Sequence, residues 1–580
     1  MDHQGVLHAL LGLDIGFVNT RASYFGILEE KYRLQACGMA SSSLGKGFQL
    51  GSGAGAAMQD LQSRSDVHIL KPNGELIWPY YETGLGVDRI AVTISGGPKL
   101  RTVLLGLTEA GSLKAGRALV ESMPLKIIGS YNLTALADEA GLVDILVNHR
   151  PDLVVLTGGE NGGAEKYVKG WIDILKLVYR ILPEEIKPDV LYAGNTFLED
   201  SVKRYLEPLA NLSVVPNIRP AQQEMDLVPA QAAIDKIVIK RWQKTIPGFK
   251  TLITRSKSIA GTKSFVFSRM IRYLGKANTK THKGILALDL GGGSTLLGAG
   301  LGEDSGVLVQ PAWEGLPEPL DDDTIDFVHQ WTAARVTRNE VSEYLCNHAL
   351  QPNFIPENSR GLAISQAYAR YRIKQASRRL AKNFAWFPYK QEKGLVGHFE
   401  PVIASGAVLT QAPKAGQSML MLIDGLEPWG VTTIVLDRHQ ILPMLGLIGT
   451  QEPVLPVHVL GSDAFESLGT VIVAVSDAPE NEAILNVRVK TDNGKDYEVE
   501  ILQDTLKRLV IPSNVTAELN LEPMVGTDVG FGGCGVGGRL KVPGGRMGVV
   551  IDARGRPLRL PEDDEKRVAE LKRWSVVLGG

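Results

Sequence analysis

Short apolar runs alternate with turn signals along this chain, and two of these runs are followed by the same pattern. Residues 285–288 are apolar and are followed by Asp289, three glycines, two hydroxyl residues and a second apolar run at 296–299. Two apolar runs at this separation predict a strand, a tight turn and a returning strand. The segment from Val6 to Phe25 has the same order, with Asp14 and Gly16 at its turn. The hydrophobic pattern therefore predicts two hairpins of one design, one near the start of each half of the chain.

The residues of the second predicted turn are suited to binding phosphate. Glycines can adopt positive φ angles and bring backbone N–H groups close to an anion, and hydroxyl side chains add donors. An aspartate beside a phosphate requires a hard cation such as Mg²⁺ between them, usually held through water. We therefore expect a phosphate and magnesium site at Asp289 that includes Gly291, Gly292, Gly293, Ser294 and Thr295. A glycine hairpin with a surface acid is the alternative for this stretch taken alone.

Two strand-Asp-Gly turns, one opening each half of the chain, resemble those of the actin, sugar-kinase and chaperone-ATPase superfamily. In that superfamily the two turns face each other and bind the phosphates of ATP. The resemblance implies an α/β fold with two ribonuclease-H-like lobes, and ATP or ADP with Mg²⁺ as cofactors. It implies that Asp14 and Asp289 are the catalytic residues, face one cleft and hold the metal through water.

The same resemblance implies further nucleotide-binding residues. In the first turn these are Gly16, Asn19 and Thr20. The superfamily also has a strand that enters a glycine turn beside the adenosine. The stretch from Pro401 to Leu409 fits this element, and it places Ser405 and Gly406 at the turn.

Between residues 125 and 242, predicted strands and helices alternate. Predicted strands at 125–128, 153–156 and 190–193 are followed by helical patterns at 133–148, 164–179 and 198–209. This alternation is typical of a parallel sheet with crossover helices. The loops at 157–163 and 193–196 contain Gly and Asn, and ligands of parallel sheets bind outside the carboxyl ends of the strands. These loops therefore point toward a site, and glycine turns that only let helices pack closely explain them nearly as well.

Several stretches resemble the glutamate mutase L family, in order, between about residues 8 and 450. They are Ser130–Thr134, Leu153–Gly163, Ala193–Asn195, Asn217–Pro220 and Asp424–Asp437. In that family the protein is an ATP-dependent reactivating factor for an adenosylcobalamin-dependent mutase, which releases damaged cobalamin so that fresh cofactor can bind. The resemblance therefore implies a weak ATPase acting as a chaperone, with a cobalamin-dependent mutase subunit of the glutamate mutase type as its partner.

Both turns depart from the family pattern. The first turn has Phe17 and Val18 where the family usually has hydroxyl residues, which leaves Asn19 and Thr20 as the nearest polar groups. In the second turn Leu296 stands where an acid generally follows. Each lost charge-assisted hydrogen bond costs about 1.5–3 kcal/mol. Weak ATP binding, slow turnover or a clamp that does not hydrolyse ATP is therefore an alternative.

We expect three parts in the chain. Residues 1–282 form the first lobe, elaborated by the parallel α/β segment at about 108–242, and residues 283–450 form the second lobe. Short β runs at 458–460, 471–475, 484–490 and 497–502 predict a β-rich domain at 451–580. A final helix begins after Pro561, because the acids that follow suit a helix N-terminus. Glycines 533, 535 and 538 have G-x-G-x-x-G spacing, but residues 539–542 continue as a strand, which excludes a dinucleotide site.

Two local expectations concern the first lobe. Residues 89–95 and 101–107 look like paired strands around a turn. The small-residue tract at 41–55 is expected to be a loop, because Gly45 and Lys46 lack the spacing of a phosphate-binding P-loop.

Composition adds few constraints. The chain has 580 residues, 44% of them hydrophobic, and a formal net charge of −2, values that suit a globular protein of several domains. The charge gives no reason to expect nucleic acid or an anionic membrane as a partner. The three cysteines lie far apart, which fits a reducing compartment and not a thiolate metal site, and no run reaches about 18 apolar residues. We expect a soluble, cytoplasmic protein.

Two other classes of function also fit the superfamily resemblance. A small-molecule kinase would need a carboxylate base aimed at a substrate hydroxyl. No carboxylate stands out for this role in the sequence, and Glu160 comes nearest to it. A nucleotide-binding, actin-like scaffold without turnover would need self-complementary surfaces.

Overall fold

The computed structural model describes residues 7–42, 50–81, 84–132, 139–163, 165–222, 224–254, 258–278, 282–312 and 320–579. The chain divides into two compact units. The first unit comprises residues 1–24 and 38–267, and the second comprises residues 25–37 and 268–580. No helix in the described part of the chain is both long enough and apolar enough to span a membrane.

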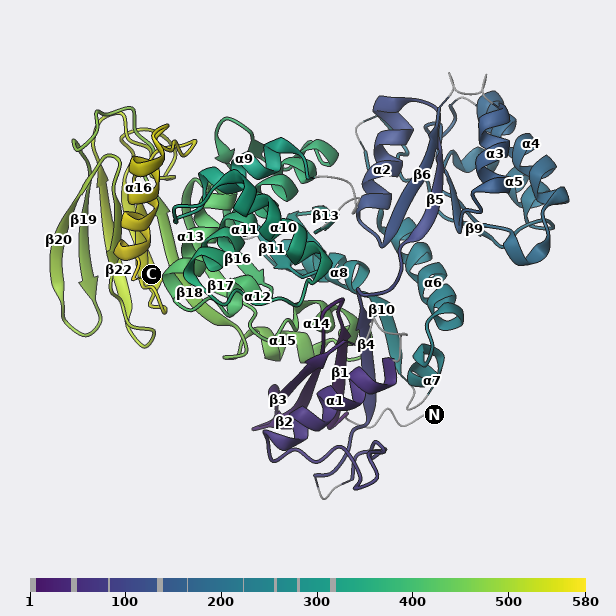
Figure 1. The fold of residues 1–580 in the computed structure, drawn as a ribbon, viewed down its shortest axis with the longest axis horizontal. Helices are drawn as coiled ribbons and strands as arrows, with labels where there is room; N and C mark the ends of the chain where they lie inside the picture. The colour runs from purple at the N-terminus through teal and green to yellow at the C-terminus, as the bar shows by residue number, and fades with distance from the viewer. Residues whose placement is uncertain are drawn as a thin grey trace. The chain divides into compact units, whose positions relative to one another are not determined.

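The first sheet has five strands in the order β10-β4-β1-β2-β3 (Figure 1). Their bounds are β1 (Ala9–Ile15), β2 (Asn19–Leu28), β3 (Lys31–Ser41), β4 (Arg89–Ile94) and β10 (Ile259–Thr262). Strand β4 is parallel to both β1 and β10. Every residue of β1 is buried, as expected for a central strand that is covered on both faces. A hairpin on one side of β1 and parallel strands on the other form a ribonuclease-H-like sheet.

Read from its other edge, the first sheet has the order β3-β2-β1-β4-β10. The second sheet repeats this order as β13-β12-β11-β16-β17. Its strands are β11 (Gly284–Leu290), β12 (Ser294–Leu301), β13 (Asp304–Pro311), β16 (Phe399–Ser405) and β17 (Gly430–Leu436). Strand β11 is antiparallel to β12 and parallel to β16, and β17 is parallel to β16. The prediction of two ribonuclease-H-like lobes, each opened by a strand-Asp-Gly hairpin, is confirmed.

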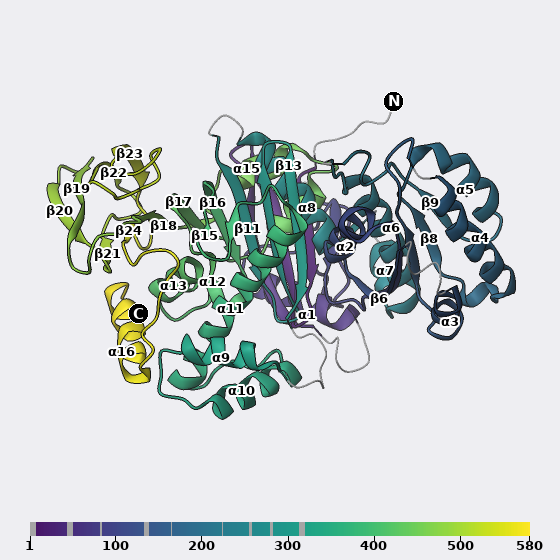
Figure 2. The same cartoon turned by 90° about the horizontal axis from the view of Figure 1, so that it is seen from above.

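Helices of the second unit cover this sheet. The long helix α11 (Ser359–Asn383) packs against α13 (Ala415–Leu426), and α9 (Asp322–Gln330) and α10 (Arg338–Leu350) lie beside it (Figure 2). The remaining short elements of this region are β14 (Tyr389–Lys390), β15 (Gly394–Leu395), α12 (Ala407–Thr410), α14 (Leu442–Ile448) and α15 (Val454–Leu460). The expected strand at 458–460 is wrong, because these residues end helix α15.

The segment after residue 450 is rich in strands, and three of them extend the second sheet. Strand β18 (Glu466–Val473) pairs antiparallel with β17, followed by β24 (Val549–Asp552) and β21 (Leu506–Leu509), so the sheet has eight strands. The others form a four-stranded sheet of β19 (Ala483–Thr491), β20 (Asp496–Leu502), β22 (Thr516–Pro523) and β23 (Gly538–Pro543). The chain ends in the expected final helix, α16 (Asp564–Val577), which is capped by the Asp563 side chain.

A buried ionic cluster, here called the Arg554 cluster, ties the end of this segment to α11 and α13. Arg554 Nη2 lies 2.9 Å from Asp424 Oδ1 and 2.8 Å from Asp552 Oδ2, and all three side chains are fully buried. Arg556 contacts the same Asp552 oxygen at 2.9 Å, and Arg370 Nε lies 2.8 Å from Asp424 Oδ2. Each buried charge thus has an opposite partner, and the loss of one partner would leave a carboxylate or guanidinium uncompensated.

An inserted α/β domain interrupts the first unit between β4 and β10. Its sheet has the order β6-β5-β7-β8-β9, and all five strands are parallel. The strands are β5 (Leu100–Leu105), β6 (Leu125–Tyr131), β7 (Leu153–Leu156), β8 (Asp189–Tyr192) and β9 (Leu212–Val214). The predicted parallel segment is present and begins earlier than expected, at β5.

Helices surround this sheet and connect it to the rest of the first unit. They are α2 (Lys114–Glu121), α3 (Glu139–Asn148), α4 (Glu165–Ile181) and α5 (Glu199–Leu206), with the short turns η1 (Glu109–Leu113), η3 (Glu184–Ile186) and η4 (Thr196–Leu198). Helices α6 (Val228–Thr245) and α7 (Phe249–Thr254) lead back to β10, and α8 (Lys263–Ala277) follows it.

Two local expectations for the first lobe are wrong. Strands β4 and β5 do not pair, because they belong to different sheets. Both are apolar enough to be buried between two neighbours, and a short separation in sequence does not show which neighbours they take. Part of the expected loop at 41–55 is the start of helix α1 (Leu50–Ser63), and residues 43–49 lie outside the described part.

Candidate functional site

The two hairpin turns share one local geometry. Gly16 stands two residues after Asp14, and a Cβ built on it would lie 2.7 Å from the carbonyl oxygen of Asn19. Gly291 stands two residues after Asp289, and its Cβ would lie 3.2 Å from the carbonyl oxygen of the residue five positions after that aspartate, Ser294. Gly16 is therefore needed for the close approach inside its turn, and the contact at Gly291 is tighter than most side chains make. The expected positive φ angles are not found at Gly291, Gly292 or Gly293.

Asp14 is held by side chains from two neighbouring elements. It is 5% exposed, and Thr93 Oγ1 donates to its Oδ1 at 2.7 Å. Lys263 Nζ lies 3.0 Å from Asp14 Oδ2, and this lysine is also buried. Asp14 pairs in register with Thr93, and Lys263 begins α8 directly after β10. The carboxyl ends of three parallel strands thus bring together an acid, a hydroxyl and an ammonium group.

The other first-turn candidates differ in accessibility. Thr20 is 1% exposed, and its Oγ1 lies 2.8 Å from the hydroxyl oxygen of Ser42. Asn19 is only partly buried, and Phe17 is half exposed. Of the two polar residues predicted here, Asn19 is therefore the one that lies near solvent.

An arginine that the sequence did not single out supports the second turn. Arg372 Nε donates to Thr295 Oγ1 at 2.9 Å, and its Nη2 donates to the Gly291 carbonyl at 2.8 Å. Burial lowers the pKa of Arg372, and the neighbouring Tyr368 and Asp289 act in the opposite direction. Arg372 lies on α11, which carries seven Lys or Arg and no Asp or Glu. That bias is the one signal in the sequence that could have indicated a role beside phosphate.

The predicted adenosine element lies next to the second turn, within the same unit. Ser405 pairs in register with Asp289, and Ser405 Oγ donates to the Asp437 carbonyl at 3.3 Å. Gly406 has a φ of 101°, and a Cβ on it would lie 2.4 Å from the carbonyl oxygen of Leu290. Only glycine fits there, because both the angle and the space exclude a side chain.

The two aspartates differ in how well they suit Mg²⁺, which prefers oxygen ligands and retains several waters. Among the described residues no group of three His, Cys, Asp or Glu could hold a metal directly. Asp14 already has the Lys263 ammonium as its cation. Asp289 is 6% exposed and pairs in register with Ser405, and its carboxylate is the kind of oxygen ligand that can hold Mg²⁺ through water.

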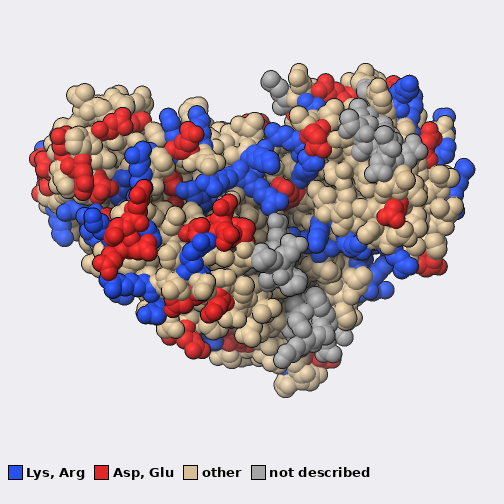
Figure 3. Space-filling view, turned by 45° about the horizontal axis from the view of Figure 1, so that its top comes forward, with Lys and Arg blue, Asp and Glu red and all other residues tan. Residues whose placement is uncertain are grey.

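Charged side chains of both signs are mixed on the face drawn in Figure 3.

A model of the family described as MutL protein matches residues 10–464, more than half of the chain. The chain belongs to the MutL family, the glutamate mutase L family. The match covers both hairpin turns, the inserted domain and the Ser405-Gly406 turn, and it ends before β18. No curated protein is similar enough in sequence to match.

Solved structures of low identity were also found. A nucleotide-free acetone carboxylase is 11% identical, with 85% of this chain and 81% of that chain covered and a TM-score of 0.34. An ATP-dependent caprolactamase from Pseudomonas jessenii has the same identity and coverage and a TM-score of 0.30. A gluconate kinase from Lactobacillus acidophilus is 12% identical, with 79% and 91% covered and a TM-score of 0.30. These TM-scores are too low to support any conclusion about this chain. The fold is assigned from the strand order of the two sheets.

Proposed function

We propose that this protein is an ATP-dependent reactivating factor for an adenosylcobalamin-dependent mutase of the glutamate mutase type. Its membership of the MutL family supports the mutase connection. The observation that carries the nucleotide is the repeated Asp-x-Gly turn, found at the same position of two sheets with the same strand order.

Each turn receives a role in this proposal. Backbone and side-chain donors at Gly16, Asn19 and residues 291–294 bind phosphate, and Ser405-Gly406 lies near the adenosine. Lys263, held by Asp14, adds a positive charge toward phosphate, and Arg372 fixes the shape of the second turn. Mg²⁺, held by Asp289 through water, would neutralise phosphate charge when bound.

Reactivation requires more than nucleotide binding. A mutase must open to release a tightly held corrinoid, and a ligand shifts such an equilibrium only by the difference in its affinity for the two states. ATP-bound and ADP-bound forms of this protein must therefore differ in affinity for the open mutase. The inserted α/β domain and the four-stranded C-terminal sheet are the candidate contact surfaces, because neither contains a residue assigned to nucleotide.

A rescue assay tests the proposal. Cobalamin-dependent mutases of the same genome are inactivated as holoenzyme and incubated with this protein, Mg-ATP and fresh adenosylcobalamin. We expect one mutase to regain activity, and we expect Asp289→Asn to abolish the rescue. If every mutase stays inactive while the protein still binds ATP, the chaperone proposal is wrong. Phosphorylation of an added small molecule, or light scattering that increases with ATP, would then favour the kinase or the scaffold.

A further inference from the structure

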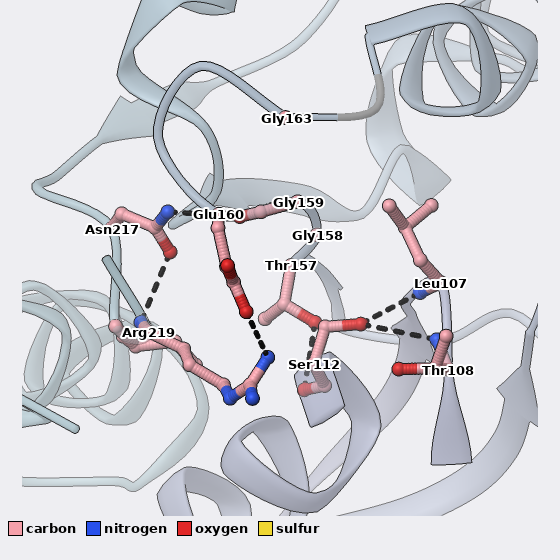
Figure 4. A pocket seen from close by; sticks show the side chains of 11 residues that line it. Leu107, Thr108, Ser112, Thr157, Gly158, Gly159, Glu160, Gly163, Asn217 and Arg219 are labelled. Carbon is pink, nitrogen blue, oxygen red and sulfur yellow. Dashed lines mark hydrogen bonds and ion pairs between the residues drawn. The ribbon is translucent and has the colours of Figure 1, made fainter. Parts of the chain in front are cut away.

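A cavity of about 230 Å³ lies in the inserted α/β domain, and no residue of either hairpin turn lines it. Its walls are the segment after β5, the glycine-rich loop after β7 and the turn after β9 (Figure 4). The strand order β6-β5-β7-β8-β9 reverses direction between β5 and β7. Doubly wound sheets bind ligands at such a reversal, outside the carboxyl ends of the strands.

The loops around this cavity are fixed to one another. Asn217 Nδ2 donates to the Gly159 carbonyl at 2.9 Å and to Asn161 Oδ1 at 3.0 Å. Asn161 Oδ1 also accepts from the backbone N–H of Thr196 at 3.2 Å. The loops after β7, β8 and β9 are therefore held by asparagine side chains, and the cavity is formed before any ligand binds.

Two opposite charges meet at this cavity. Arg219 Nη1 lies 3.2 Å from Glu160 Oε1, with side-chain exposures of 23% and 45%. Figure 4 shows the two side chains pointing toward one another beside the hydroxyls of Ser112 and Thr157. A partly exposed ion pair contributes little to stability, so a ligand with its own charges can replace it. Glu160, considered above as a kinase base, is thus paired with an arginine in the inserted domain.

We propose that this cavity binds a free α-amino acid, a function that goes beyond mutase reactivation. The ligand's ammonium group would bind Glu160 and its carboxylate would bind Arg219. Both groups are attached to the same carbon, so their spacing matches the closely spaced Glu160 and Arg219 side chains. Phosphate would be repelled by Glu160, and a simple amine by Arg219. Leu107 and Ile218 also line the cavity and provide an apolar wall for a small side chain.

Ligand screening on the full-length protein tests this site. Thermal unfolding is measured with each of the twenty L-amino acids and with propionate, propylamine and inorganic phosphate. At least one amino acid should raise the unfolding temperature, and the three other compounds should not. Calorimetry then measures its Kd. We expect Glu160→Gln and Arg219→Gln each to weaken binding at least tenfold. The matched control is Glu165→Gln, which lies on α4 outside the cavity and should bind as the wild type does.

The outcomes separate this site from its alternatives. Without ligand, Glu160→Gln and Arg219→Gln should each unfold within a degree or two of the wild-type temperature. If Arg219→Gln does not fold, Glu160→Gln alone tests the proposal. Absence of any amino-acid shift at 10 mM, or equal affinity in wild type and Glu160→Gln, would overturn the proposal. Binding of phosphate or propionate that tightens in Glu160→Gln would replace it with an anion site. The mutase rescue assay does not depend on any of these results.

Discussion

Lys263 Nζ lies 3.0 Å from Asp14 Oδ2, and both side chains are buried. Removing one member of such a pair leaves the other as an uncompensated buried charge. We expect Lys263→Met to lower the free energy of unfolding by about 3 kcal/mol, as measured by urea denaturation, and to weaken ATP binding in calorimetry. Lys114→Met, at an exposed position of the same unit, is the control and should leave both quantities unchanged.

A double variant checks that the effect comes from this pair. Asp14→Asn combined with Lys263→Met should cost less than the sum of the two single variants, with a coupling free energy of about 1–3 kcal/mol. Strict additivity would show that the two side chains act independently and would contradict the proposed role of Asp14.

The second turn depends on the two hydrogen bonds of Arg372. Arg372→Lys keeps the positive charge but cannot reach Thr295 Oγ1 and the Gly291 carbonyl together, because it lacks the planar guanidinium. We expect about a tenfold loss of ATP affinity, equal to about 1.4 kcal/mol. Lys382→Ala, at an exposed position near the end of the same helix, should retain full affinity. If both variants bind ATP equally well, Arg372 does not shape a nucleotide site.

Gly406 should tolerate no side chain. Its φ of 101° and the 2.4 Å approach of an added Cβ to the Leu290 carbonyl both oppose Gly406→Ala. We expect this variant to lose about 2 kcal/mol or more of unfolding free energy. Gly302→Ala is the matched control, because Gly302 also has a positive φ but has no atom within 4 Å of the added Cβ. It should therefore lose only about 1 kcal/mol, the cost of the angle alone.

The Arg554 cluster predicts a dependence of stability on pH. Burial by itself would raise the pKa of Asp552, but Arg554 and Arg556 lower it far below its usual range. A carboxylate with a depressed pKa in the folded state adds stability above its unfolded pKa, and this stability is lost as pH falls below about 4. Asp552→Asn should therefore be less stable than the wild type at pH 7, and the difference should shrink at pH 3.

Denaturation at the two pH values measures this effect. Asp496→Asn is the control, because Asp496 also has a lowered pKa, caused by a hydrogen bond from Arg488, but is exposed. Its removal should change stability little at either pH. A constant difference between wild type and Asp552→Asn from pH 3 to 7 would contradict the prediction.

The sequence predicted the parts of the site that are local. Asp14 with Gly16 and Asp289 with Gly291 could be recognised because each turn is closed within a few residues. Lys263 could not, because it meets an aspartate 249 residues away, and only the register of β1, β4 and β10 brings them together. The strand at 458–460 failed for a related reason, since short apolar runs suit a buried helix as well as a strand.

The eight-stranded sheet continues past residue 464, where the family match ends. Strand β17 pairs with β18 along its whole length, from Gly430 to Leu436. A chain cut at that boundary would expose the N–H and C=O groups of β17 as an open edge, and it would leave Asp424 without Arg554. Such edges pair with other chains, so the shortened protein should aggregate. By pairing with β17, the C-terminal segment covers an edge through which copies of this chain could otherwise associate.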